Sequence, residues 1–118
     1  MALDHDSETP IAFLADVGSW DGHALLRLIG ELDLSSADAA EATAARALER
    51  GRRGALIVDL SEVSFCDSMG VRALAHIAEA ARREERAMVL RAPQLPVRRV
   101  LQITGFDCYF EFPADRGT

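Results

Sequence analysis

The residues best placed to do chemistry form the stretch Asp67-Ser68-Met69-Gly70, which follows a short apolar run and precedes a helical pattern. One interpretation makes Ser68 an N-cap, whose oxygen accepts hydrogen bonds from the free N–H groups of the first helical turn. The other makes Ser68 a phosphorylation site, because the positive end of a helix and its free backbone donors accommodate a dianion. The phosphate would add about −1.5 to −2 charges beside the carboxylate of Asp67.

A phosphate at that place changes a surface without unfolding the protein, so the pattern suggests a switch that controls binding. Arg72 lies four residues after Ser68 and shares its face of the helix, where it can pair with the phosphate or with a carboxylate of a partner. The alternative is that Arg72 is an ordinary solvated arginine.

Other kinds of site have little support in the sequence. The histidines His5, His23 and His76 lack the spacing of metal ligands, so neither a metal nor another cofactor is expected. Cys66 replaces the first glycine of a G-x-S-x-G nucleophile elbow, and no histidine is positioned to activate Ser68. Glycine-rich phosphate-binding loops are missing. A receiver-type phosphoaspartate domain is weakly supported, because it uses a late lysine and this chain has none.

Five segments have the pattern of strands that must position Ser68. The first two are joined by Asp21-Gly22, a strong hairpin signal that predicts an antiparallel pair. The third is a continuous apolar run and is expected to be central in the sheet. The five predicted strands span residues 11–17, 24–32, 55–60, 87–92 and 108–112.

Three segments have the periodicity of amphipathic helices. The first has Ser35 or Ser36 as its N-cap, Asp38 in its first turn and Gly51 just after its end. The third is opened by prolines and closed by a glycine. The predicted helical segments span residues 34–51, 68–83 and 93–105. Their predicted inward faces are, in order, Ala40, Ala44, Ala47 and Leu48; Val71, Leu74, Ala75, Ala78 and Ala81; and Val97, Val100, Leu101 and Thr104.

A hairpin followed by strand-helix-strand crossovers predicts an α/β fold with a mixed β-sheet. Its N-terminal hairpin is antiparallel, its later strands are parallel, and its helices lie mainly on one face. Sites in such sheets gather where strands run into helices, and Ser68 lies at one of these junctions. We expect one domain over residues 11–112, a flexible leader over residues 1–10 and a flexible tail over residues 113–118.

Composition narrows the possible partners and the location. With 118 residues, a net charge of −6 and a pI near 5.0, the chain fits one acidic domain and argues against direct nucleic-acid binding. No apolar segment is long enough to span a bilayer and the N-terminus does not resemble a signal peptide, so a cytoplasmic location is expected. Both cysteines are expected to be buried and reduced. Pattern does not decide whether Trp20, Phe106, Tyr109 and Phe110 are core or contact residues, so the oligomeric state stays open.

Three segments, in this order and spacing, resemble the STAS domain family, specifically the single-domain bacterial anti-sigma factor antagonists. "GELDLSSADA" at residues 30–39 is similar to the family segment that leads into its first helix. "LIVDLSEVSFCDSMGVRAL" at residues 56–74 is similar to the strand and D-S-x-G loop that hold the regulatory serine. "VRRVLQITGFDCYFEF" at residues 97–112 is similar to the family's late helix, T-G-F/L turn and last strand.

The resemblance implies a switch in protein partners that affects transcription. The unphosphorylated antagonist binds an anti-sigma factor that is also a serine kinase, and the sigma factor is released. Phosphorylation of the serine corresponding to Ser68 separates the complex, and a PP2C-type phosphatase restores the active form. Asp33, which alone reads as a turn or helix-entry carboxylate, is then expected near that serine. The implied partner-binding residues are Asp33, Asp67, Ser68, Met69, Gly70 and Arg72.

Two residues depart from the family pattern. Met69 replaces a second hydroxyl that many relatives have, which offers an apolar contact, and Arg72 replaces a residue that is often small. An alternative function is therefore kept, an accessory STAS subunit of another assembly such as an ABC-type lipid transporter or a stress-signalling scaffold. A third hypothesis, an enzyme that uses Ser68 and Asp67 directly, lacks an identifiable base, and we predict that the protein is not an enzyme.

Overall fold

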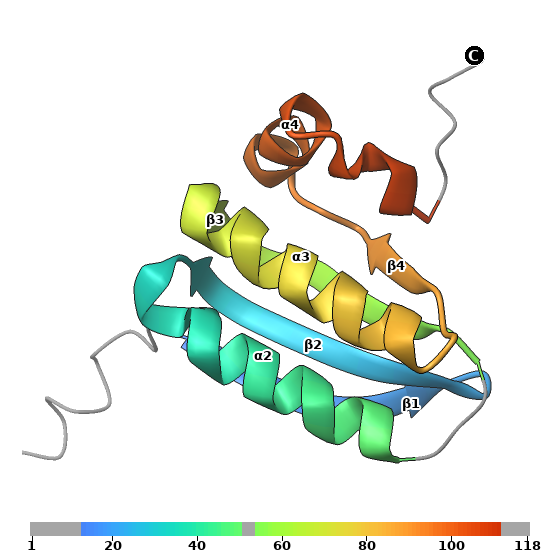
Figure 1. The fold of residues 1–118 in the computed structure, drawn as a ribbon. Coiled ribbons are helices and arrows are strands. Elements are labelled where there is room, and N and C mark those ends of the chain that lie inside the picture. Colours follow the sequence, from blue (N-terminus) through green and yellow to red (C-terminus); the bar gives the residue numbers. More distant parts are fainter. Residues whose placement is uncertain (1–12, 51–53, 112–118) are drawn as a thin grey trace, which may run out of the picture.

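The computed structural model describes residues 13–50 and 54–111, which form one layer of strands and the helices packed against it (Figure 1). The predicted leader and tail, together with Ile11, Ala12, Gly51 and Phe112, lie outside the described residues. The elements in chain order are β1 (Phe13–Trp20), β2 (His23–Leu32), α2 (Leu34–Glu49), β3 (Leu56–Cys66), α3 (Ser68–Arg83), β4 (Met88–Arg91), α4 (Leu95–Ile103) and the short 3₁₀ helix η1 (Phe106–Tyr109).

The four strands form a mixed sheet in the order β1-β2-β3-β4. β1 and β2 are antiparallel, and their connection places Asp21 and Gly22 at positive φ angles of 55° and 87°, as a tight primed turn requires. β2 pairs with β3 in parallel, and β3 pairs with β4 in parallel. The predicted mixed sheet, its antiparallel start and the interior place of β3 are confirmed.

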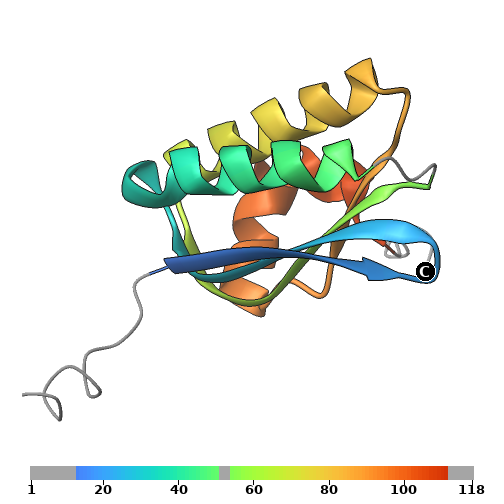
Figure 2. The same cartoon turned by 90° about the horizontal axis from the view of Figure 1, so that it is seen from below.

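The core lies on one face of the sheet. Alternate residues of β2 point to this face, and Leu26, Leu28 and Leu32 are almost fully buried. Viewed from below, α2 and α3 lie side by side over this face (Figure 2). Each fully buried leucine contributes roughly 1.5–3 kcal/mol of transfer free energy, so this layer supplies most of the stability.

Most of the predicted inward residues are buried. On α2, Ala40, Ala44, Ala47 and Leu48 all face the core, and these small side chains let the helix approach the sheet closely. On α3, Val71, Leu74 and Ala81 are buried, whereas Ala75 and Ala78 are only half-buried. Ala73 and Ile77 are buried although the prediction left them out, because α2 and β3 flank α3 on two sides and widen its buried face.

Two strand predictions needed correction. β3 continues to Cys66, six residues past the predicted end at Leu60, because residues 62–66 pair with β2 across two register shifts that interrupt the alternation. The predicted last strand is wrong. Phe106–Tyr109 form η1 instead, and only Phe110 makes an isolated parallel bridge, to Leu90.

The C-terminal elements close one side of the core. α4 carries a proline in its first turn and ends at Ile103, and Val97 and Leu101 are buried as predicted. Val100 is half-buried, while Thr104 follows the helix as its C-cap and is exposed. Gly105 follows with a φ of 85° and begins the 3₁₀ turn. No helix within the described residues combines the length and apolarity needed to cross a membrane.

Candidate functional site

The start of α3 is built around Asp67 rather than Ser68. Asp67 is the N-cap, in an extended conformation, and its Oδ1 accepts hydrogen bonds from the backbone N–H groups of Met69 at 3.0 Å and Gly70 at 3.1 Å. The interpretation of Ser68 as the N-cap is therefore wrong. The carboxylate takes that role because it accepts two hydrogen bonds at once and carries the negative charge that the helix terminus favours.

Freed from capping, Ser68 is the first residue of α3 and is exposed to solvent. Its hydroxyl makes no hydrogen bond with any other described residue. A phosphoryl group attached to this oxygen would meet the N-terminal end of a sixteen-residue helix. Ser68 is thus reachable by an enzyme and is not needed to hold the helix start together.

Gly70 holds the first turn of α3 tightly against the end of β2. A Cβ atom at this position would overlap the carbonyl oxygen of Leu32 and lie 2.8 Å from the Sγ atom of Cys66. Gly70 itself is buried. A glycine here is therefore required by packing, whatever contact with a partner is also predicted for it.

The start of α2 repeats the arrangement at α3. Asp33, and neither Ser35 nor Ser36 as predicted, is the N-cap, and its Oδ1 accepts hydrogen bonds from the N–H and the hydroxyl of Ser35. Ser36 is the third helical residue, and its hydroxyl accepts from the Asp33 N–H in a reciprocal capping box. Asp38 lies beyond the first turn, which contains no acidic residue.

Hydrogen bonds hold Asp33 in its charged form. The Ser35 hydroxyl is the main cause, with the backbone of Ser35 and Ser36 adding to it, and together they lower the pKa of Asp33 below its ordinary value. Asp33 is therefore a carboxylate at neutral pH. Its position as the N-cap of α2 agrees with the interpretation of Asp33, made from the sequence, as a carboxylate at the entry of a helix.

The sheet brings these two helix starts to the same edge. β2 and β3 are parallel, Leu32 is in register with Cys66, and the Asp67 N–H donates to the Leu32 carbonyl at 3.4 Å. Asp33 follows Leu32 directly and Asp67 follows Cys66, so both N-caps lie at the carboxyl end of the sheet. The N-terminal ends of α2 and α3 lie together there in Figure 1. This is the strand-to-helix edge where sites gather in α/β sheets.

The remaining predicted residues surround Ser68. Met69 is half-buried beside it, and Arg72 is exposed one turn further along α3. Arg72 forms no ion pair with another residue of the described part of the chain. Its guanidinium group is available either to a phosphate on Ser68 or to a partner.

Two apolar residues at this edge were missed by the sequence prediction. Leu34, the first residue of α2, is 69% exposed, and Phe65, near the end of β3, is 45% exposed. Leu34 directly follows the G-E-L-D segment and Phe65 stands three residues before Ser68, so proximity to both motifs was the available signal.

The site offers a hydroxyl that can receive a phosphate but little that would activate it as a nucleophile. Both histidines of the described residues are engaged elsewhere. His23 Nδ1 accepts from the Ala55 N–H at 2.9 Å, and His76 Nδ1 lies 2.9 Å from the Glu41 carboxylate.

Cys66 is part of the buried support under this site and should be chemically inert. Burial, together with the nearby Asp67 carboxylate, raises the pKa of its thiol to about 11. Cys108 is exposed, so the prediction that both cysteines are buried is wrong for Cys108. Because the thiolate is the reactive form, iodoacetamide at pH 8 is expected to alkylate Cys108 of the native protein and to leave Cys66 unmodified. Peptide mass spectrometry measures this, and both cysteines should react in urea. Alkylation of native Cys66 at the rate of Cys108 would contradict the packing described here.

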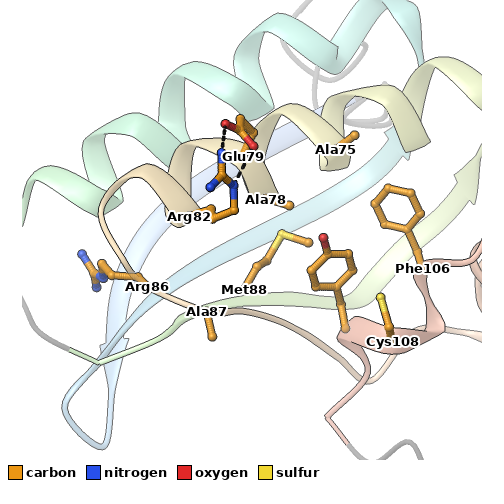
Figure 3. A pocket seen from close by; sticks show the side chains of 10 residues that line it. Ala75, Ala78, Glu79, Arg82, Arg86, Ala87, Met88, Phe106 and Cys108 are labelled. Carbon is orange, nitrogen blue, oxygen red and sulfur yellow. Dashed lines mark hydrogen bonds and ion pairs between the residues drawn. The ribbon is translucent and has the colours of Figure 1, made fainter.

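A separate pocket of about 400 Å³ lies along the second half of α3, between this helix, β4 and η1 (Figure 3). Phe106 and Tyr109, whose ring centroids lie 5.5 Å apart, both line the pocket, and the Glu79–Arg82 ion pair lies on its α3 side. None of the predicted site residues lines it. The pocket is therefore distinct from the edge that carries Ser68.

Comparison with known proteins supplies the family. The STAS domain family model matches residues 16–117. No curated protein is significantly similar to the chain. Among solved structures, an anti-sigma factor antagonist from Mycobacterium paratuberculosis is 27% identical, covers 87% of this chain and 86% of its own, and gives a TM-score of 0.70.

Two further structures share the fold at lower identity. The Bacillus cell fate determinant SpoIIAA, in its phosphorylated form, is 22% identical over 82% of this chain and 88% of its own, with a TM-score of 0.62. The murine anion transporter Slc26a9 is 17% identical over 89% of this chain but only 20% of its own, with a TM-score of 0.67. The family match covers most of the chain and agrees with the mixed sheet and the edge of helix starts described above, so the chain belongs to the STAS domain family.

Proposed function

We propose that this protein is an anti-sigma factor antagonist controlled by phosphorylation of Ser68. The unphosphorylated form binds an anti-sigma factor that is also a serine kinase, and this binding releases the sigma factor. Phosphorylation of Ser68 by the bound kinase ends the interaction, and a PP2C-type phosphatase reverses it. The protein itself acts as a binding protein and needs no catalytic residue.

The observation that carries this proposal is the position of Ser68. Its side chain is exposed at the N-terminus of α3, while Asp67 performs the capping. Modification of the hydroxyl therefore breaks no hydrogen bond of the cap. The phosphate also gains from the helix dipole, an effect worth roughly 0.3–1 kcal/mol at an exposed site. The fold thus accommodates the charge, and the surface changes.

Charge explains why the phosphorylated form releases its partner. Asp33 and Asp67 already place two carboxylates at this edge, and the phosphate adds about −1.5 to −2 more. A partner surface matched to a neutral hydroxyl has no room for a hydrated dianion. Arg72, which lies one turn away, can pair with the phosphate and hold it.

Similar proteins support this proposal. The Mycobacterium paratuberculosis structure is described as an anti-sigma factor antagonist. The SpoIIAA structure holds a phosphorylated protein of this fold, which agrees with a phosphate that leaves the STAS fold intact.

A second candidate function is an accessory STAS subunit of another assembly, such as a transporter. The likeness to a segment of Slc26a9 favours it, because there the fold forms a minor part of a transport protein. In that case the edge around Ser68 serves only as a docking surface. No stoichiometric phosphorylation of Ser68 is then expected.

Phosphorylation in vitro tests the proposed function. Each purified serine-kinase anti-sigma factor of the source organism is incubated with the protein and ATP, and the modified residue is located by mass spectrometry. We expect one phosphate, on Ser68, in the presence of ATP and none in its absence. Ser64→Ala is the matched control, because Ser64 is also exposed and lies in the same peptide region at the end of β3. A phosphate on another residue, or none with any kinase, would favour the accessory-subunit function.

A further inference from the structure

Two exposed apolar side chains lie at the edge that carries Ser68 and have no role in the core. Leu34 is the first residue of α2 and directly follows its N-cap Asp33, just as Ser68 is the first residue of α3 and follows Asp67. Leu34 and Ser68 therefore occupy equivalent positions at the starts of two neighbouring helices. At 69% exposure, Leu34 leaves most of its surface in water.

Phe65 occupies the other side of the same edge. It is in register with Glu31, while the next pair, Leu32 and Cys66, is buried. Since side chains alternate along strands, Phe65 and Glu31 point to the face of the sheet opposite α2 and α3. The ring of Phe65 is 45% exposed. Leu34 and Phe65 thus border the edge from its two faces, with Ser68 at the edge itself.

The charges around this pair are mainly negative, and Arg72, one turn along α3, is the basic exception. Glu31 is exposed, and the capping carboxylates of Asp33 and Asp67 lie at the helix starts between Leu34 and Phe65. Arg27 belongs to a different group, since it pairs with Asp16 and Glu62 further down the sheet. A surface with apolar side chains among carboxylates complements a partner with an apolar hollow and a basic rim.

We infer that Leu34 and Phe65 are the apolar anchors by which this protein docks on its kinase-type anti-sigma factor, in a hollow whose rim is basic. This inference rests on the proposed function, since a kinase that reaches Ser68 has to cover this edge. Burial of the two side chains supplies affinity, because exposed leucine and phenylalanine lose contact with water on docking. The carboxylates supply orientation, and a phosphate on Ser68 acts at the centre of the docked surface.

Binding measurements with purified proteins test this inference. The Kd for the serine-kinase anti-sigma factor is measured with ADP for the wild type, Leu34→Ala and Phe65→Ala. Each substitution is expected to raise Kd about tenfold, because each removes the side chain that fills the hollow. In the phosphorylation reaction with ATP, both should raise KM and leave kcat unchanged, because Ser68 and the cap of α3 at Asp67 are not altered.

Ile103→Ala is the matched control. Ile103 is 84% exposed at the C-terminal end of α4, so its truncation removes a similar apolar side chain away from the helix starts. We expect it to bind like the wild type. For the charges, Glu31→Gln should weaken binding and reduce the dependence of Kd on salt concentration. Circular dichroism and thermal unfolding confirm that each variant is folded, which is expected because these side chains lie outside the core.

The outcomes separate this inference from the proposed function. Wild-type affinity in both Leu34→Ala and Phe65→Ala, with binding still weakened by Ser68→Asp, overturns the docking surface and leaves the proposed function standing. A Kd that does not change with salt concentration would contradict the basic rim proposed for the partner's hollow. Failure of the wild type to bind any serine-kinase anti-sigma factor overturns both proposals.

Discussion

Replacing Ser68 by aspartate is expected to weaken binding to the serine-kinase anti-sigma factor about a hundredfold, or about 2.7 kcal/mol. Asp33 and Asp67 already carry negative charge at the same edge, and a third carboxylate has to be desolvated when a partner covers it. Titration calorimetry in the presence of ADP measures the change. The fold is expected to tolerate the substitution, because a carboxylate at the first helical residue interacts favourably with the helix dipole.

Ser68→Ala is the control for this prediction. It removes the acceptor of the phosphate without adding charge, so it should retain wild-type affinity and keep it in the presence of ATP. Both variants should unfold at or above the wild-type temperature, which separates an effect on binding from an effect on folding. Equal affinities of Ser68→Ala and Ser68→Asp would show that charge at this position does not control binding.

Gly70→Ala is expected to destabilise the protein by about 2 kcal/mol or more. Helix propensity alone would favour alanine by about 1 kcal/mol. Steric overlap outweighs this gain, because the new Cβ meets the backbone carbonyl of Leu32, which is held by the pairing of β2 with β3. In thermal unfolding, Tm should fall by about 10 °C or more.

Gly18→Ala provides the matched control for the glycine substitution. A Cβ at Gly18, in β1, would lie 3.6 Å from Leu25, which is an ordinary contact. We expect its stability to equal or slightly exceed that of the wild type, since alanine loses less conformational entropy than glycine on folding. Equal unfolding temperatures of Gly70→Ala and Gly18→Ala would contradict the close packing of α3 against the end of β2 that is described here.

Much of the fold follows from patterns within a few residues of each other. The Asp21-Gly22 turn, the strand that follows it and the extent of α3 from Ser68 to Arg83 were all predicted and are confirmed. The errors arose where the same short sequence pattern fits two different local structures. At both helix starts an aspartate lies within three residues of a serine, and pattern rules accept either residue as the N-cap.

The last predicted strand failed for a similar reason. The segment "CYFEF" at residues 108–112 is rich in aromatic residues and resembles a strand, but Gly105 at positive φ turns the chain, and Phe106 and Tyr109 pack against each other in η1. Contact with the rest of the core, rather than the local sequence pattern, decided the positions of Phe106 and Tyr109. Only Phe110 reaches a strand, through its bridge to Leu90.

By itself, the sequence determined the mixed sheet, the order of the helices and a serine at a strand-to-helix junction, because turn chemistry and hydrophobic periodicity act over short distances along the chain. Only the tertiary structure decided that Asp67 frees the Ser68 hydroxyl and that Gly70 is pressed against Leu32. These features depend on the register between β2 and β3, whose paired residues are more than thirty positions apart. That register is set by burial of the whole core face, which no local pattern contains.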